Sequence, residues 1–446
     1  MKLAVIGAGS AEFSLKLVGD LCLTPNLGGS VVHLMDVDRG RLDAVHALLR
    51  CYADEVGAQL DVRSTLERRE ALAGADFVVN TALAAPNARL FEGWRVAQEH
   101  GYRHGGSLHV MHDEAFWINF FQLRLFSSLV EDMLEICPDA WLLELANPVF
   151  AGVTHLARRY PQANIVGLCH GFHEVYAIAD ALGLDHERLT FEIPGVNHFV
   201  WLTRCLHDGH DVMPLLDAWL EEQAEVYWTT CGHDDPLGPK QIDLYRRFGV
   251  FPIGDTGTWG GGSWGWTYHT DDEVAARWKV DPVRGWEAKF EGDLERVELI
   301  RELGRSADVK ITSVVPPDPS GEVIVPLIEA IACDIPRVLI GNVLNATDSV
   351  PGLPRDIAVE VPLSANGEGL RPIATTPLPA PVVAHALRDY VAPVNLELAA
   401  FESRSRSTLL ELVLTDPWTT SEHQARAMLD AILALPFHAD LRDHYE

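Results

Sequence analysis

The chain has 446 residues and a formal net charge of −29, an acidic excess that disfavours nucleic acids and anionic membranes as partners. Hydrophobic residues make up 48% of it, enough for the cores of two or three domains. The seven cysteines form no CxxC pair, a pattern typical of a reducing compartment. There is no apolar run of about 18 residues and no cleavable leader, so we expect a cytoplasmic protein.

The first 36 residues have the pattern of a dinucleotide-binding fold. An apolar strand over residues 2–6 leads into Gly7-Ala-Gly9-Ser10 and a helix, and a second strand ends at Asp36. The glycines would let the backbone approach a pyrophosphate at the helix N-terminus, and the Asp36 carboxylate could accept from both ribose hydroxyls. This favours NAD over its 2′-phosphorylated relative. Glu12 occupies the place of the usual third glycine, so a plain strand–helix turn without cofactor is the alternative.

Further strands end in polar residues, where parallel sheets carry their chemistry. Asn80 closes the predicted strand 75–80, and Asn147 follows the predicted strand 141–146. We expect both side chains to face the cofactor. Cys169 and His198 each lie at the end of an apolar run, and a thiolate with an imidazole suits zinc, manganese or iron. An ordinary buried thiol is the alternative for Cys169.

The rest of the chain predicts a mixed α/β second half that adds helices against the first sheet. Asp113 precedes a long helix and is interpreted either as a site carboxylate or as a capping acid. The apolar face of that helix is formed by Phe116, Phe120, Leu123, Phe126, Leu129 and Met133. Residues 251–269, rich in Gly and Trp, suit a lip that stacks on sugar rings, although packed surface turns have the same composition. A charged helix is predicted over 284–308.

With these residues placed, the chain resembles glycoside hydrolase family 4, the NAD- and divalent-metal-dependent glycosidases, and most of all its bacterial α-glucosidase branch. The resemblance extends over nearly the whole length. It is carried by Gly7-Ala-Gly-Ser10, Leu34-Met-Asp-Val-Asp38, Ala146-Asn-Pro-Val-Phe150, Gly167-Leu-Cys-His-Gly171, Gly195-Val-Asn-His198, Pro252-Ile-Gly-Asp-Thr256, Ser320-Gly-Glu322 and Leu433-Ala-Leu-Pro436.

The resemblance implies an α/β fold with two parts. Residues 1–190 would form a Rossmann-like doubly wound sheet, as in lactate and malate dehydrogenases, that binds NAD. Residues 191–446 would form a mixed α/β C-terminal domain for substrate, metal and oligomerisation. A homodimer or homotetramer acting on a small-molecule glycoside, without nucleic-acid or membrane partners, is the expected state.

The resemblance also implies the chemistry, which differs from that of ordinary glycosidases with two carboxylates flanking the bond. Bound NAD oxidises C3 of the sugar transiently, a base removes the C2 proton, and a metal such as Mn²⁺ stabilises the resulting charge while the C1–O bond breaks by elimination. Cys169 and His198 become the metal ligands. Asp255 matches the base and Asp113 the acid, with an exchange of these roles left open. Asn147 matches a position that contacts sugar and cofactor. His170, beside Cys169, is a candidate for contact with a sugar hydroxyl, with a structural histidine as the alternative.

Two departures from the family pattern bear on the substrate. The Arg that follows Asp-Thr-Val in relatives is missing after Asp255-Thr-Gly257, and the stretch 104–112 also differs. Cys169-His170 replaces the Cys-Asn of members that act on 6-phosphosugars, which disfavours such substrates. An α-glucosidase is expected, with an α-glucuronidase, α-galacturonidase or α-galactosidase as the alternative. An NAD-dependent 2-hydroxy acid dehydrogenase and a catalytically inactive sugar or NAD sensor are the competitors from other classes.

Overall fold

The structure is a computed structural model that describes most of the chain. The described residues are 1–104, 109–112, 114–232, 235–257, 264–280, 285–286, 288–292, 295, 302–303 and 310–446. Asp113, residues 258–263 of the Gly- and Trp-rich segment, and most of the predicted charged helix 284–308 therefore lie outside the described residues.

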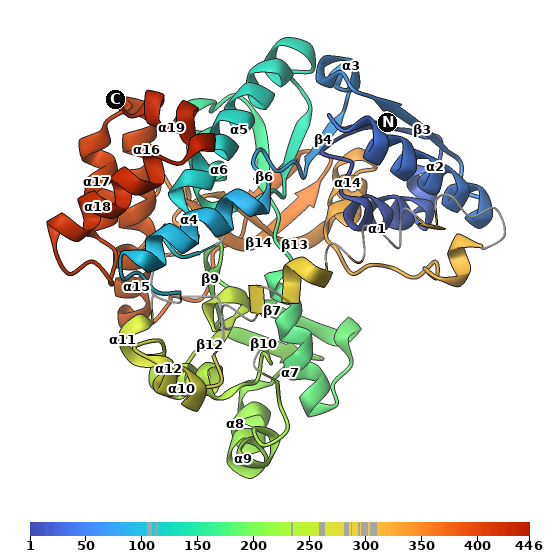
Figure 1. Cartoon of the computed structure of the whole chain (residues 1–446). Coiled ribbons are helices and arrows are strands. Elements are labelled where there is room, and N and C mark those ends of the chain that lie inside the picture. Colours follow the sequence, from blue (N-terminus) through green and yellow to red (C-terminus); the bar gives the residue numbers. More distant parts are fainter. Residues whose placement is uncertain are drawn as a thin grey trace.

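One 12-stranded sheet crosses the molecule (Figure 1). Its order is β12-β9-β8-β14-β13-β6-β5-β4-β1-β2-β3, and β15 pairs with β14. The strands are β1 (Lys2–Ile6), β2 (Ser30–Met35), β3 (Leu60–Thr65), β4 (Phe77–Asn80), β5 (Trp141–Glu144), β6 (Asn164–Gly167), β8 (Gly195–Val196), β9 (Phe199–Leu202), β12 (Phe251–Ile253), β13 (Arg337–Leu344), β14 (Ala358–Asn366) and β15 (Gly369–Pro372). A separate three-stranded sheet holds β7 (Leu189–Glu192), β10 (Arg204–His207) and β11 (His210–Asp211).

The segment β3-β2-β1-β4-β5-β6 is parallel throughout and has the strand order of dinucleotide-binding folds. Strands of a parallel sheet are covered on both faces, and accordingly all of β4 and most of β1 and β5 are buried. The Rossmann-like doubly wound sheet predicted from the sequence is confirmed.

The predicted mixed α/β character of the second half is confirmed, and this half contributes strands to the first sheet as well as helices against it. It extends the same sheet with antiparallel strands, because β13 pairs with both β6 and β14, and β8, β9 and β12 follow outward. The sequence shows these strands as short apolar runs, but pairings such as that of β13 with β6 join segments far apart in the chain and leave no local trace. The large sheet therefore contains strands from before and after residue 190, which itself lies in β7 of the smaller sheet.

Helices cover both faces of the sheet, and the structure describes eighteen α-helical segments. They are α1 (Ala11–Cys22), α2 (Arg39–Val56), α3 (Arg68–Leu72), α4 (Asn87–Glu99), α5 (Phe116–Ile136), α6 (Val149–Arg159), α7 (Glu174–Leu182), α8 (Met213–Glu222), α9 (Ala224–Tyr227), α10 (Pro239–Phe248), α11 (Gly265–Tyr268), α12 (Asp272–Arg277), α14 (Ile324–Ala332), α15 (Ala380–Ala386), α16 (Ala392–Ser403), α17 (Arg406–Leu414), α18 (Glu422–Leu433) and α19 (Ala439–His444). A π-helical turn, Leu387–Val391, joins α15 to α16.

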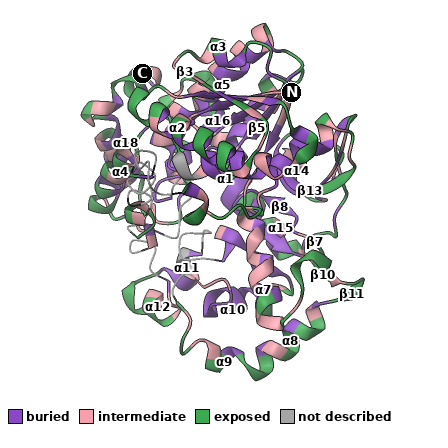
Figure 2. Cartoon of the chain, turned by 90° about the vertical axis from the view of Figure 1, so that its right-hand side faces the viewer, coloured by how far each residue is buried: buried purple, intermediate pink, exposed green. Residues whose placement is uncertain are grey.

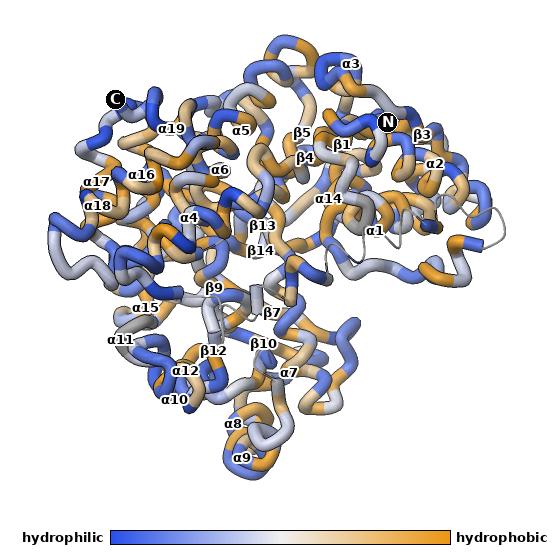
Figure 3. The backbone as a smooth tube through the Cα atoms, in the orientation of Figure 1, coloured by the Kyte–Doolittle hydropathy of each residue, from blue (hydrophilic) through white to orange (hydrophobic). Residues whose placement is uncertain are grey.

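Two hydrophobic cores meet on α5. The larger core fills the space between the sheet and its helices, and the smaller one lies among α4, α5, α17 and α18. The buried residues in Figure 2 and the hydrophobic tube in Figure 3 both concentrate in the sheet and the helices against it. The predicted apolar face of α5 is confirmed, since Phe116 and Phe120 enter the smaller core and Leu123, Phe126, Leu129 and Met133 the larger. This helix thereby fixes the C-terminal bundle against the sheet.

A lobe of shorter elements, α7 to α12 with the small sheet, lies below the large sheet in Figure 1. Among the described helices, none is both long enough and apolar enough to cross a membrane.

The packing of α4 on α5 gives a test of the smaller core. A Cβ placed on Gly93 of α4 would overlap the indole of Trp117 in α5. Gly93→Ala should lower the free energy of unfolding by about 1–3 kcal/mol in a denaturant titration, more than the helix propensity gained. Gly40→Ala, at an exposed position of α2 without such a neighbour, is the matched control and should be neutral or stabilising. Equal stability of the two variants would contradict this packing.

Candidate active site

A cavity of about 2020 Å³ lies at the C-terminal ends of the parallel strands. Its lining comes from the turns after β1, β2, β4, β5 and β6 and from the lobe below them. Nine of the residues singled out in the sequence line it, namely Gly7, Gly9, Ser10, Asp36, Asn147, Cys169, His170, His198 and Asp255. The fold thus brings the dinucleotide turn and the thiol–imidazole pair into one cavity.

The turn after β1 leaves no space for side chains. Gly7 has φ +85°, and a Cβ there would lie 2.5 Å from backbone atoms of Ala82. A Cβ on Gly9 would lie 2.7 Å from Asp36 Oδ2, the oxygen that accepts a hydrogen bond from the Gly9 N–H at 2.8 Å. The bare backbone at the start of α1 is therefore a cradle that fits a pyrophosphate.

Apolar side chains stand exposed beside this turn. Val37, next to Asp36, is 86% exposed, and Leu83, after β4, is 60% exposed, and both line the cavity. Exposed apolar residues on a cavity wall are typical of contact with a flat ring system. The sequence analysis missed both, although an apolar residue directly after the strand-ending acid is a usable signal.

The two asparagines predicted to face the cofactor lie differently. Asn147 lines the cavity, and its carbonyl accepts from Gln122 Nε2 at 3.0 Å. Asn80 is fully buried, does not appear among the described residues that line the cavity, and donates through Nδ2 to both carboxylate oxygens of Glu144 at 2.9 Å. Burial raises the pKa of Glu144 to about 8. Asn80 therefore supports the end of β5.

His198 lies at the centre of a group of polar side chains that includes Cys169, Asp255 and Glu114, and we call this part of the site the polar end. Its backbone has φ 65°, the left-handed region that costs a residue with a Cβ of the order of 1 kcal/mol. Its Nδ1 lies 3.2 Å from Asp255 Oδ2 and 3.7 Å from Glu114 Oε1. Burial lowers the pKa of His198, but Asp255, Glu114 and a hydrogen bond with Cys169 outweigh it and hold the pKa well above its ordinary value. The predicted pair Cys169 and His198 is in contact.

Two groups missed by the sequence analysis complete this end. Ligand atoms of His112, Glu114 and His198 all lie within 4.8 Å of one another, and the three side chains are buried. A thiol, imidazoles and a carboxylate are donors that suit a divalent transition metal. The site fits such an ion. Glu114 was passed over because an acid just before a helix is commonly a cap; the His-x-Glu spacing was the available signal.

The segment that carries His112 and Glu114 is held from several sides. The Phe116 N–H donates to the His109 carbonyl at 2.9 Å, and Asn119 Nδ2 donates to the Glu114 carbonyl at 2.9 Å. His109 Nδ1 lies 2.9 Å from the buried Glu397 Oε2 of α16. The C-terminal bundle therefore positions part of the polar end.

Asp255 lies on a short 3-10 turn, Gly254–Thr256, that is anchored on both sides. The Gly254 N–H donates to Glu174 Oε2 at 2.6 Å, and the Thr256 hydroxyl accepts from the Val200 N–H at 2.8 Å. Burial raises the pKa of Glu174 to about 8, with Asp255 adding to the shift. These anchors fix the Asp255 carboxylate beside His198.

Buried amides support the neighbouring residue Asn197. Its Nδ2 donates to Glu360 Oε2 at 3.0 Å, and Asn342 Nδ2 donates to the same oxygen at 3.0 Å. Burial raises the pKa of Glu360, which lines the cavity with Asn197. His170 stands exposed on the cavity wall, as expected for a group that meets a ligand.

Of the predicted aromatic lip, residues 258–263 lie outside the described residues, and the described Trp264 does not line the cavity. Trp264 is 3% exposed, donates through Nε1 to the Thr256 carbonyl at 3.0 Å, and stacks on Phe199. It packs inward because β9 and β12 offer it an apolar surface. Trp286 and Phe290 line the cavity instead, with ring centroids 5.4 Å apart and planes at 22°.

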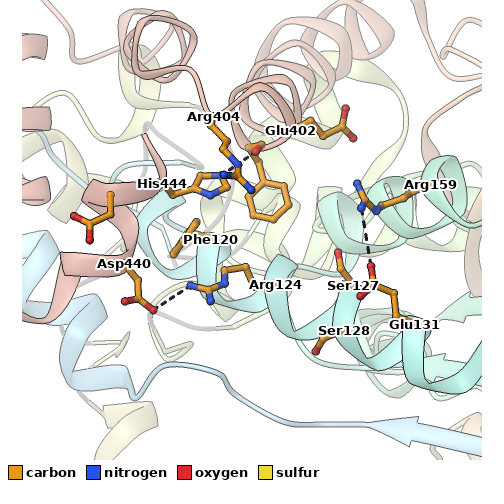
Figure 4. Close-up of a pocket in the computed structure, with 12 residues that line it drawn as sticks. Phe120, Arg124, Ser127, Ser128, Glu131, Arg159, Glu402, Arg404, Asp440 and His444 are labelled. Atoms are coloured by element: carbon orange, nitrogen blue, oxygen red, sulfur yellow. Dashed lines mark hydrogen bonds and ion pairs between the residues drawn. The ribbon is translucent and has the colours of Figure 1, made fainter. Parts of the chain in front are cut away.

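A smaller cavity of about 540 Å³ lies among α5, α6, α16 and α19 (Figure 4). Its charges are matched within its own wall, since Arg124 pairs with Asp440 at 3.1 Å and Arg159 lies 4.0 Å from Glu131. The groups suited to bond-breaking chemistry gather in the larger cavity.

The raised pKa of Glu174 predicts a pH dependence of stability. From about pH 4.5 to about pH 8 the folded chain keeps this proton while the unfolded chain releases it, so stability falls as the pH rises. In the parent, this proton makes the free energy of unfolding fall by up to about 1.4 kcal/mol per pH unit. Glu174→Gln should lose this contribution when the free energy of unfolding is measured by denaturant titration at several pH values. Glu187→Gln, exposed in the same lobe, is the control and should follow the parent; an unchanged decline in Glu174→Gln would contradict the assignment.

Comparison with known proteins gives the family context for this geometry. Residues 2–183 match the model of family 4 glycosyl hydrolases, and residues 193–419 match the model of the family 4 glycosyl hydrolase C-terminal domain.

The relatives of known name differ in the sugar that their names give as substrate. The chain is 25% identical to an α-galactosidase of Bacillus subtilis over all of both chains. It is 28% identical to an α-glucosidase of Erwinia rhapontici over 44% of each chain. It is 23% identical to an α-galacturonidase of Thermoanaerobacter italicus, over 72% of this chain and 71% of the relative.

Solved structures share the fold. A 6-phospho-α-glucosidase from gut microorganisms, in complex with NAD and Mn²⁺, superposes with a TM-score of 0.79 at 20% identity, over 97% of each chain. A malate dehydrogenase of Plasmodium falciparum superposes with a TM-score of 0.51 at 14% identity, over 92% of this chain and 99% of the other. The dehydrogenase-like architecture predicted from the sequence is confirmed.

Proposed function

The chain belongs to family 4 of the glycosyl hydrolases, and from that premise we propose that it cleaves an α-linked glycoside with NAD and a divalent metal, Mn²⁺ in the first instance. One observation carries the proposal: the bare glycine turn and the Cys169–His198 pair face the same cavity. A cofactor on the turn and a metal at the pair could then act on one sugar.

The dinucleotide end sets where the cofactor would lie. The Gly7–Ser10 turn would bind the pyrophosphate. Asp36 accepts a hydrogen bond from the Gly9 N–H through one carboxylate oxygen, and its carboxylate would also accept hydrogen bonds from the ribose hydroxyls. A 2′-phosphate beside Asp36 would meet like charge, which favours NAD. When bound, NAD would supply reversible hydride transfer at C3 of the sugar.

The polar end sets where the sugar would react. Cys169 and His198 would hold the metal, which would supply Lewis-acid stabilisation of charge on sugar oxygens. Asp255 would take the C2 proton, a role supported by its anchored position beside His198 and by the 41% exposure of its side chain. Asp113 keeps its proposed role as the acid at the glycosidic oxygen, and the two roles could be exchanged. Asn147 and His170 would contact sugar hydroxyls.

For the sugar we propose an α-glucoside first, with an α-galactoside as the near alternative. A second candidate, an α-hexuronide, is favoured by a specific feature. Lys289 lines the cavity beside Trp286 and Phe290, and the Trp286 ring lies 6.4 Å from that of His112, centroid to centroid. An ammonium group on the cavity wall would suit a sugar carboxylate.

The remaining expectations accompany this proposal. Residues 1–190 would bind NAD and residues 191–446 would supply substrate, metal and subunit contacts, in a cytoplasmic homodimer or homotetramer. A net 2-hydroxy acid dehydrogenase on the same fold is the competing function, and it differs by accumulating reduced cofactor.

The test is a panel of α- and β-linked nitrophenyl glucosides, galactosides, glucuronides and galacturonides, with NAD and Mn²⁺ each added or omitted. Nitrophenol release from one α-linked sugar only when both are present, without growth of the reduced-nicotinamide absorbance, is the expected result. Stoichiometric reduction of NAD with no aglycone released would overturn the proposal in favour of a dehydrogenase.

Replacement of the thiol separates metal from cofactor. Cys169→Ser should weaken Mn²⁺ binding by about 100-fold or more and abolish metal-dependent turnover, because a hydroxyl does not ionise to a soft ligand. NAD affinity should persist, since the glycine turn is intact. Cys205→Ser, a buried thiol away from the cavity lining, is the control. Full activity of Cys169→Ser with Mn²⁺ would remove the metal-site assignment.

A further inference from the structure

Two carboxylates face the same nitrogen of His198 but differ sharply in exposure. Glu114 Oε1 lies 3.7 Å from His198 Nδ1 and Asp255 Oδ2 lies 3.2 Å from it. The Glu114 side chain is 7% exposed and that of Asp255 is 41% exposed. The Glu114 carboxylate is thus enclosed beside the imidazole, while the Asp255 carboxylate opens toward the cavity where a substrate would lie.

We propose that Glu114 is a third protein ligand of the divalent metal, beside Cys169 and His198, and that Asp255 acts on the sugar instead of binding the metal. The proposal rests on the metal requirement proposed above. Two donor atoms that each lie about 2.1 Å from one ion can be up to about 4.2 Å apart. Glu114 Oε1 and His198 Nδ1 are 3.7 Å apart, so both atoms could bind the same ion.

The surroundings of Glu114 support this role. His112, two residues earlier, brings a further donor within 4.8 Å of both Glu114 and His198. The Glu114 carbonyl is held by Asn119, and His109 on the same segment is held by Glu397. The Glu114 carboxylate therefore lies on a fixed segment next to two imidazoles, and these are the donor types that a divalent transition metal takes.

The ligand set also bears on which metal is bound. A thiolate and an imidazole alone suit zinc, whereas an added carboxylate oxygen shifts the site toward harder ions that take more ligands, such as Mn²⁺. Glu114 would therefore tune selectivity as well as affinity.

The experiment measures Mn²⁺ and Zn²⁺ binding to the full-length parent, Glu114→Ala and Glu114→Gln by calorimetry, and the number of exchanging waters on bound Mn²⁺ by proton relaxation. Glu67→Gln, a carboxylate on the cavity wall at the dinucleotide end, is the matched control. NAD affinity and thermal unfolding without metal confirm that each variant folds.

Glu114→Ala should bind Mn²⁺ about 10- to 100-fold more weakly, lose less affinity for Zn²⁺, and carry one more water on the bound Mn²⁺. Glu114→Gln should fall between it and the parent, and Glu67→Gln should match the parent. Unchanged Mn²⁺ affinity in Glu114→Ala, or weaker binding without the added water, would overturn the role of Glu114. A parent chain that binds no Mn²⁺ would instead overturn the proposed function.

Discussion

The buried imidazole of His198 is the group on which the polar end of the cavity depends. A ring enclosed with a thiol and two carboxylates is held by their charges against the cost of burial, and its left-handed backbone adds strain of the order of 1 kcal/mol. Such strain persists only where the surroundings determine the conformation. Here Glu360 accepts buried hydrogen bonds from the side chains of Asn197, directly before His198, and of Asn342.

The continuous sheet explains how distant parts of the chain meet at this ring. The parallel segment places Gly7, Asp36, Asn147 and Cys169 after its strands, and the antiparallel extension brings in His198 beside β9 and Asp255 after β12. Both halves of the chain therefore contribute loops to the same end of one sheet. The distance between a cofactor on the glycine turn and a metal at Cys169 is then set by the spacing of the strands and not by a hinge.

The sequence predicted those parts that local patterns encode. The glycine turn, the strand-ending Asp36 and the apolar face of α5 follow from residue spacing, and the structure places them as expected. Other features depend on tertiary contacts. Asn80 is buried, and the Glu144 carboxylate accepts its amide, whereas Trp264 packs inward on Phe199. Glu114 has the local pattern of a capping acid, and only the fold brings it to His198.

The central claim is that this cavity breaks a glycosidic bond by removing the C2 proton of the sugar, with hydride transfer and metal stabilisation serving that step. The most direct measurement is hydrolysis of the cleaved glycoside in D₂O, followed by NMR of the released sugar. Deuterium at C2 in every released sugar molecule is the predicted result. Release of a sugar that keeps its original hydrogen at C2 would contradict the account.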